Sequence, residues 1–272
     1  LYDNLDAMNC LIDAGANLNM RDANGSTPLH YALLSNNTEL AMHLVQKGAD
    51  VNIPDSGGRS PLQLSVIKDN VKCAKLFVKF NANVNYQGPT KLTALSMAII
   101  LERKNFVKLL VENGANINLR DDDGNTALHA AVMRGDTGLV QYLIARRADV
   151  NIPDPEGRSP LQLSVIKDNV KFAKLFVKFN ANVNYQGPKK LTALTLAIRL
   201  GRMNIVNVLV ENGVDTNLRD DRGQTALHAA VMRGDTGLVY CLIARGADVN
   251  IPDSGGKSPL QLSVIKDYGP QN

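Results

Sequence analysis

The stretch NIPDSGGRSPLQLSVIKDNVK, from Asn52 to Lys72, occurs three times in this chain with few changes. It returns as NIPDPEGRSPLQLSVIKDNVK from Asn151 and as NIPDSGGKSPLQLSVIKDYG from Asn250, so the copies begin 99 residues apart. Near-identity that extends to polar positions indicates a recent duplication of a whole block. Internal similarity of this kind predicts a structure made of repeated units.

The repeat unit is shorter than this block. A tetrad that begins with Thr or Ser, continues with Pro or Ala and has Leu third recurs at one constant spacing without an insertion. The tetrads begin at Thr27, Ser60, Thr93, Thr126, Ser159, Thr192, Thr225 and Ser258. Three variants alternate (TPLH or TALH, then SPLQ, then TALS or TALT), so each 99-residue block contains three units. A period of about 33 residues is typical of stacked repeat architectures.

Each unit predicts a helix, a turn and a second helix. A short helix-compatible run follows the tetrad, then a polar or Gly break such as RGD at Arg134, then an amphipathic run such as TGLVQYLIAR from Thr137. The Thr or Ser hydroxyl caps the first helix, with Pro at its first position in several units. The second helix is expected to end at a left-handed residue, and this position holds Gly48, Gly114, Gly213, Gly246, Asn81, Asn180 and Arg147. Arg147 is a strained choice there.

DANGSTPLHYALLSNNTELAMHLVQKGADVN, from Asp22 to Asn52, resembles the ankyrin repeat, and the resemblance extends over essentially the whole chain. It implies an all-α repeat solenoid of stacked helix-turn-helix units with β-hairpin fingers, whose concave face and fingertips bind other proteins. One such unit cannot bury its apolar face alone and must stack on neighbours. The segments YQGPTKLT and YQGPKKLT lack the usual Asp and Gly before Thr93 and Thr192, so we expect these two fingers to be shaped differently.

We interpret residues 1–272 as a single ankyrin-repeat domain. Its expected parts are a partial repeat 1–21, repeats 22–54, 55–87, 88–120, 121–153, 154–186, 187–219 and 220–252, and an incomplete last repeat 253–272. The chain is an array of about eight repeats. Neither end carries a polar capping repeat, so we interpret this array as a fragment of a longer one. The last repeat is expected to expose Leu260, Leu262, Val264 and Ile265.

Composition favours a soluble, intracellular and cytoplasmic protein. The 272 residues are 44% hydrophobic and 21% charged, with no Trp, no basic and apolar leader, and no apolar run approaching the roughly 18 to 20 residues of a membrane span. Cys10, Cys73 and Cys241 lie among helix-periodic apolar residues and are predicted to be buried thiols. A net charge of +4 is modest for this length and does not indicate nucleic acid by itself.

The sequence predicts neither catalysis nor a cofactor or metal. No Ser or Cys nucleophile with a nearby base, and no acidic pair unique to one location, stands out from the repeating frame. His30, His129 and His228 occur once per block, too far apart along a stack for one metal. The resemblance implies instead that each hydrogen-bonds to the Thr that begins its tetrad.

Two variable positions are candidates for partner binding, and the resemblance places both on the concave surface. We name the residue just before each tetrad the finger position and the residue eight after its Thr or Ser the helix position. At the finger position the candidates are Arg59, Leu92, Asn125, Arg158, Leu191 and Lys257. At the helix position they are Lys68, Leu101, Arg134, Lys167, Leu200, Arg233 and Lys266. Repeats with basic residues at these two positions therefore alternate with repeats that have Leu there. We expect these residues to bind a partner; the alternative is that the charges only keep the surface soluble.

The expected function is a non-catalytic protein-protein interaction scaffold that binds an unidentified protein partner through an acidic, partly apolar segment. The alternative is a regulatory ankyrin segment of a larger channel, enzyme or ubiquitin-ligase adaptor that packs against its own polypeptide. Nucleic acid is disfavoured because leucines interrupt the basic levels and aromatic residues for base stacking are scarce. Neither membrane insertion nor a small-molecule substrate is expected.

The resemblance also predicts a modification. Asn52, Asn151 and Asn250 each follow a Leu eight residues earlier, which resembles the pattern that asparaginyl hydroxylases modify in ankyrin arrays. Asn also suits such a turn for structural reasons alone. Mass spectrometry of protein from its native cell should find one added oxygen on these peptides, and unmodified peptides would leave only the structural reason.

Overall fold

The computed structural model describes residues 3–268 and divides into two compact units, Leu1–Ala130 and Ala131–Asn272. Unit 1 contains α1 (Asp3–Asp13), α2 (Pro28–Leu34), α3 (Thr38–Gln46), α4 (Pro61–Ile67), α5 (Val71–Lys79), α6 (Ala94–Ile100) and α7 (Lys104–Glu112). The boundary falls inside α8 (Ala127–Arg134). Unit 2 continues with α9 (Thr137–Ala145), α10 (Pro160–Ile166), α11 (Val170–Lys178), the 3₁₀ turn η1 (Pro188–Lys190), α12 (Ala193–Leu200), α13 (Met203–Glu211), α14 (Ala226–Arg233), α15 (Thr236–Ala244) and α16 (Pro259–Tyr268).

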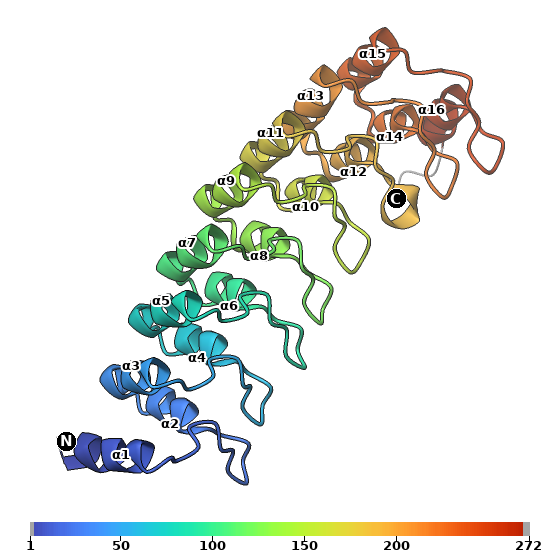
Figure 1. Ribbon diagram of the computed structural model, residues 1–272. Helices are drawn as coiled ribbons and strands as arrows, with labels where there is room; N and C mark the ends of the chain where they lie inside the picture. The colour runs from blue at the N-terminus through green and yellow to red at the C-terminus, as the bar shows by residue number, and fades with distance from the viewer. Residues whose placement is uncertain (1–2, 269–272) are drawn as a thin grey trace. The chain divides into compact units, whose positions relative to one another are not determined.

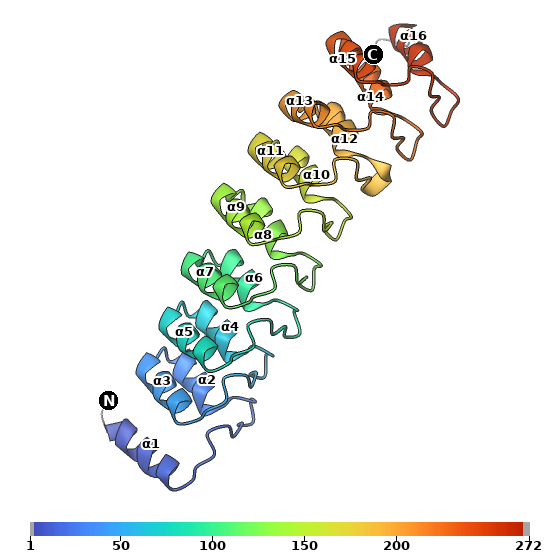
Figure 2. The ribbon, with the colours of Figure 1, turned by 45° about the horizontal axis from the view of Figure 1, so that its top comes forward.

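Within each unit the helices lie in two layers (Figure 1). In unit 1 the short helices α2, α4 and α6 form one layer, and the longer helices α3, α5 and α7 form the other. Unit 2 repeats this arrangement with α10, α12, α14 and α16 in the short layer. Hairpin-shaped loops, the fingers, project beside the short helices (Figure 2). The predicted helix-turn-helix repeats are therefore confirmed.

Local chemistry starts and stops each short helix. The Ser60 hydroxyl accepts a hydrogen bond from the Gln63 N–H at 3.2 Å, and the Ser60 N–H donates to Gln63 Oε1 at 2.9 Å. This reciprocal pair satisfies two backbone N–H groups that a helix start otherwise leaves open. Pro61 follows as the first helical residue. The turn after the helix contains Asp69, whose φ of 55° is left-handed.

The core lies between the two layers. The Leu in third place of each tetrad is at most 2% exposed from Leu29 through Leu227. The corresponding residues of the longer helices, seventeen positions after the tetrad start, are equally buried: Leu44, Phe77, Leu110, Leu143, Phe176, Leu209 and Leu242. Full burial of one such side chain contributes about 1.5 to 3 kcal/mol, so these two rows supply a large part of the stability of every repeat.

The fingers close by turns, and residues 3–268 contain no strand. In a typical finger the Asp55 N–H donates to the Arg59 carbonyl and the Gly58 N–H donates to the Asp55 carbonyl, both at 2.9 Å. The expected β-hairpins are thus hairpin-shaped loops without a regular ladder. The two unusual fingers differ as predicted: Lys91 and Lys190 occupy the position of Gly58 with φ of 49° and 53°.

Two burial predictions are wrong. Cys73 is buried, and burial raises the pKa of its thiol to about 11, but Cys241 is half-buried and Cys10 is exposed. Cys10 lies on α1, which has no short helix of its own repeat beside it in the described residues 3–268. Leu262 was expected to be exposed and is only 8% exposed, because α16 packs against α14.

Two histidines cap their helices as buried neutral rings. The backbone N–H groups of Thr27 and Thr225 donate to the Nδ1 atoms of His30 and His228 at 2.9 and 3.1 Å. Burial is the largest influence on the pKa of each imidazole and lowers it below its ordinary value. The expected hydrogen bond between each His and its Thr is present, and the third pair makes it too, with the Thr126 N–H donating to His129 Nδ1 at 3.0 Å.

The left-handed end of the longer helices is confirmed, and Arg147 adopts φ of 69° where Gly246 has 86°. We expect Arg147→Gly to raise the free energy of unfolding by about 1 kcal/mol, because glycine adopts this conformation without a Cβ clash. Chemical denaturation measures the change. The reciprocal variant Gly246→Arg is the control: a Cβ there meets no atom within 4 Å, so backbone strain alone should lower stability by a similar amount. A lower midpoint for Arg147→Gly would contradict the assignment.

The buried histidines predict a pH dependence. Because their folded pKa values lie below the ordinary 6.5, protonation favours the unfolded chain, and stability should fall as pH drops below about 6.5. The chain supplies a matched replacement, since Gln63 makes the same backbone bond in its repeat. The double variant His30→Gln and His228→Gln should therefore unfold with a shallower pH dependence between pH 7 and 5. An unchanged slope would assign the effect to other groups.

Candidate functional site

The candidate binding residues lie on the fingers and at the ends of the short helices. Eight of them are exposed: Arg59, Lys68, Leu101, Arg134, Lys167, Leu200, Arg233 and Lys257. Leu92, Asn125, Arg158 and Leu191 are half-buried. Lys266 lies in α16, but its side chain is outside the described part of the structure. We call the surface formed by the finger positions, the helix positions and the residue before each helix position the finger-side surface.

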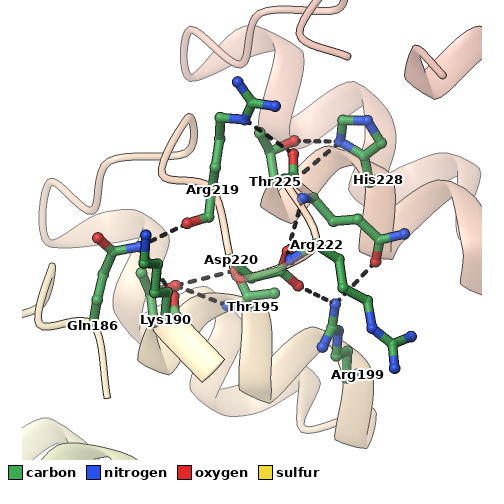
Figure 3. Close-up of polar contacts among 12 residues, drawn as sticks. Gln186, Lys190, Thr195, Arg199, Arg219, Asp220, Arg222, Thr225 and His228 are labelled. Carbon is green, nitrogen blue, oxygen red and sulfur yellow. Dashed lines mark hydrogen bonds and ion pairs between the residues drawn. The ribbon is translucent and has the colours of Figure 1, made fainter. Parts of the chain in front are cut away.

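Direct contacts join these positions within unit 2. Arg199, near the end of α12, donates from Nη2 to Asp220 of the following finger and, at 3.0 Å, to Oε1 of Gln224, the finger-position residue (Figure 3). The Lys167 Nζ donates to the Met133 carbonyl at 3.3 Å, which joins the helix position of this repeat to the end of α8 in the preceding one. The finger-side surface is therefore continuous from one repeat to the next within this unit.

Two of the predicted cations are already paired inside the protein. Arg59 forms an ion pair with Asp55 at 2.7 Å, and Arg158 forms ion pairs with Asp154 at 2.6 Å and Glu156 at 2.7 Å. Burial by itself raises the pKa of Asp55, but hydrogen bonds from the side chain and backbone of Arg59 outweigh it and the pKa is lowered. These arginines thus hold their fingers in shape besides presenting charge. Lys68 and Lys167 extend from the short layer and are exposed.

The structure adds a set of exposed apolar residues, of which the sequence predicted only Ile265. We call them the apolar row; they stand seven residues after every tetrad start except Thr192, next to the helix position. In unit 1 they are Leu34, Ile67 and Ile100, which are 43%, 37% and 47% exposed. In unit 2 they are Met133, Ile166, Met232 and Ile265, between 40% and 54% exposed. A sequence signal existed, because the apolar stripe of each short helix is one position wider than its core contact requires.

The four leucines predicted to bind a partner differ in exposure. Leu101 and Leu200 are 40% and 44% exposed and extend the apolar row. Leu92 and Leu191 are half-buried, and their carbonyls accept hydrogen bonds from the Nε2 atoms of Gln63 and Gln162 at 2.7 and 2.6 Å. The latter pair therefore ties neighbouring fingers together through its backbone.

The predicted hydroxylation residues take part in hydrogen bonds between repeats. Asn52 accepts from the Asn83 N–H at 2.7 Å and donates to the Asn81 carbonyl at 3.2 Å. Asn151 makes the same two bonds one block later, with Asn182 and Asn180. The Asn250 N–H donates to Asp248 Oδ1 at 2.8 Å. Modification at these positions stays a prediction, and the structure adds that Asn52 and Asn151 join adjacent turns.

Within residues 3–268 no group of three or more His, Cys, Asp or Glu side chains is arranged to hold a metal ion. In the same range no helix is both long and apolar enough to cross a membrane. The finger-side surface offers charged and apolar side chains on a repeating backbone, which suits recognition of an extended segment of another molecule.

Comparisons with known proteins agree with this architecture. The family model described as "Ankyrin repeats (3 copies)" matches residues 1–88, 80–154, 129–220 and 212–270. Among solved structures the chain is similar to the ankyrin repeat domain of Bcl-3, described as a unique member of the IkappaB protein family, with 29% identity and a TM-score of 0.70. That match covers 81% of this chain and 99% of the Bcl-3 chain. The comparison with curated proteins found no match.

Proposed function

This chain belongs to the ankyrin repeat family, whose members act as non-catalytic protein-protein interaction modules, and we propose that its finger-side surface binds an acidic, partly apolar segment of a partner protein. The partner's Asp and Glu side chains pair with Lys68, Lys167 and the neighbouring arginines. Its apolar side chains lie on the apolar row. The protein acts by binding and not by catalysis.

The observation that carries this proposal is the exposure of the apolar row beside exposed cations. Single exposed apolar residues are ordinary, but a repeated series at one position of successive repeats is the kind of patch that marks an interaction site. In unit 1, Ile67 and Ile100 are 37% and 47% exposed, with Lys68 and Leu101 as their immediate neighbours in the chain. Cations beside the apolar row favour a ligand that carries both acidic and apolar residues.

Burial of apolar side chains supports affinity, and the charges support specificity and association rate. The ion pairs of Arg59 and Arg158 within their own fingers reduce the charge that these residues offer to a partner. Lys68 and Lys167 are therefore the cations on which we expect binding to depend most. They occupy equivalent positions in two copies of one block, so each unit offers one such lysine beside its own part of the apolar row.

The test uses a library of displayed peptides that combine Asp or Glu with Leu, Ile or Phe, and a second library in which Lys replaces the acids. Selected peptides should come from the acidic library. The double variant Lys68→Glu and Lys167→Glu should weaken their binding at least tenfold, because each reversal replaces attraction by repulsion. Raising the salt concentration across the physiological range should slow association with the unmodified chain.

A matched control comes from the longer helices of the same repeats. Lys72 on α5 and Lys171 on α11 are also exposed, but they lie in the other layer. Lys72→Glu and Lys171→Glu make the same change in net charge and should leave binding unchanged. Binding that is lost in this control and retained in the first double variant would move the site to the longer helices. Circular dichroism should confirm that both variants fold like the original chain.

A further inference from the structure

The longer helices of unit 1 concentrate positive charge on a layer that the proposed function does not use. Together with the residue that follows each of them, α3, α5 and α7 contain six lysines and two glutamates, and all these side chains are exposed. The surplus of positive charge equals the net charge of the whole chain, +4. We call the lysines the lysine patch; they are Lys47, Lys72, Lys75, Lys79, Lys104 and Lys108.

Helix geometry gathers these lysines on one side of the layer. Lys72, Lys75 and Lys79 are spaced by three and four residues along α5, so they project from the same face of the helix. Phe77 lies on the opposite face and is fully buried. The neighbouring helix α7 contacts α5 (Figure 1), and its Lys108 stands one repeat period after Lys75. Packed helices lie roughly 8 to 10 Å apart, so the ammonium groups of α5 and α7 form one patch.

Contacts inside the protein do little to neutralise the lysine patch. The three lysines of α5 form no ion pair and no side-chain hydrogen bond with any residue of the described range 3–268. Lys108 approaches Glu112 only to 4.0 Å, and both side chains are exposed. Like charges within a Debye length of about 8 to 10 Å repel one another in ordinary salt. The lysine patch therefore destabilises the free chain, and an anionic ligand that covers it stabilises the fold.

The residue type favours a surface of many mobile anionic groups over one phosphate of fixed geometry. A lysine ammonium acts as a point charge on a flexible stem, whereas arginine offers the planar fork that binds one phosphate through two parallel bonds. Arg103, which directly precedes α7, is already paired with Asp69 at 2.9 Å. Lysines that are free to move suit the head groups of anionic phospholipids, which are themselves mobile.

An exposed aromatic ring accompanies the lysines. Phe80 directly follows Lys79 and is 41% exposed. An aromatic ring among cations suits the boundary between the head groups and the acyl chains of a membrane. Single-stranded nucleic acid instead requires successive rings on which its bases stack. Among the described residues of α3, α5, α7 and the positions that follow them, Phe80 is the one exposed phenyl ring, since Phe77 and Phe106 are fully buried.

We propose that the longer helices of unit 1 bind the anionic surface of a phospholipid membrane. The lysine patch lies against the phosphate and carboxylate groups of the lipid heads, and the Phe80 ring reaches the boundary with the acyl chains. The chain thus lies on the membrane and inserts no helix. This inference goes beyond the proposed function and does not depend on it, because the finger-side surface belongs to the other layer of helices.

Unit 2 contains a reduced copy of the lysine patch. Its helix α11 repeats the three lysines of α5, and Phe179, which follows them, is 40% exposed. The neighbouring helices α9 and α13 contain no lysine, and α13 ends in Glu211. Fewer cations per unit area give weaker attraction to an anionic surface, so we expect unit 1 to bind more strongly than unit 2.

The experiment measures sedimentation of the full chain with vesicles of phosphatidylcholine alone and with vesicles that also contain phosphatidylserine. The chain should sediment with the second kind only, and raising the salt concentration across the physiological range should weaken this binding. The triple variant Lys72→Gln, Lys75→Gln and Lys79→Gln should bind these vesicles roughly a hundredfold more weakly. The same change in α11, Lys171→Gln, Lys174→Gln and Lys178→Gln, should have a smaller effect.

A matched control removes the same charge from the fingers and the short helices. Lys68→Gln, Lys91→Gln and Lys167→Gln should leave vesicle binding within about twofold of the original chain, because these lysines lie outside the layer that faces the membrane. Phe80→Ala should weaken vesicle binding without changing its salt dependence, since no charge is lost. The α5 variant should still bind the acidic peptides, which separates this site from the finger-side surface.

Four outcomes would each overturn the proposal. The first two are equal binding to both kinds of vesicle and unchanged binding of the α5 variant. The third is a larger loss in the α11 variant than in the α5 variant. The fourth is displacement of the chain from the vesicles by a random DNA duplex or by inorganic phosphate at the same phosphate concentration, which would assign the lysine patch to nucleic acid or to a single anion. Failure of the peptide test would leave these results unchanged.

Discussion

The structure depends on burial that no repeat can complete alone. A short helix of seven residues and a longer one of nine, such as α4 and α5, leave apolar side chains on both sides of the pair. Leu62 and Phe77 are at most 1% exposed because α4 contacts α2 and α6 while α5 contacts α3 and α7. Stability is therefore a sum of contacts between neighbours, and it fails where a neighbour is absent.

Polar contacts set the register of that stack. Gln87 donates from Nε2 to its own finger and, at 2.7 Å, to the Arg120 carbonyl of the next one. Arg219 does the same with the Pro252 carbonyl at 2.8 Å. Together with the bonds of Asn52 and Asn151, these contacts join fingers and turns of adjacent repeats. Apolar packing alone tolerates small sliding movements, whereas these directional bonds have one geometry. They keep the exposed positions of successive repeats aligned.

Duplication explains both the regularity of the surface and its exceptions. The 99-residue copies preserve Lys68 and Lys167, Leu101 and Leu200, and most of the apolar row. Within the apolar row, one position becomes polar: Arg199 stands where Ile100 stands in the preceding block, and it pairs with Asp220. The Arg at this position removes one apolar side chain from the surface. Its ion pair also satisfies the carboxylate of Asp220, whose side chain is only 1% exposed. Such a change alters recognition locally without disturbing the stack.

The sequence by itself determined the period, the two helices of each repeat, their caps and the left-handed residue Arg147, because these follow from local chemistry and from spacing along the chain. It also indicated that the fingers before Thr93 and Thr192 differ. Only the tertiary structure decided which apolar residues are covered. Ile67 and Val66 are adjacent and similar in sequence, yet one is 37% and the other 0% exposed. The pairing of Arg59 with Asp55 was likewise beyond the sequence pattern, since it depends on how a tight turn folds back on itself. Burial and ion pairing are properties of contacts between segments, and a repeat pattern states where segments begin and end but not which side chain of each one meets its neighbour.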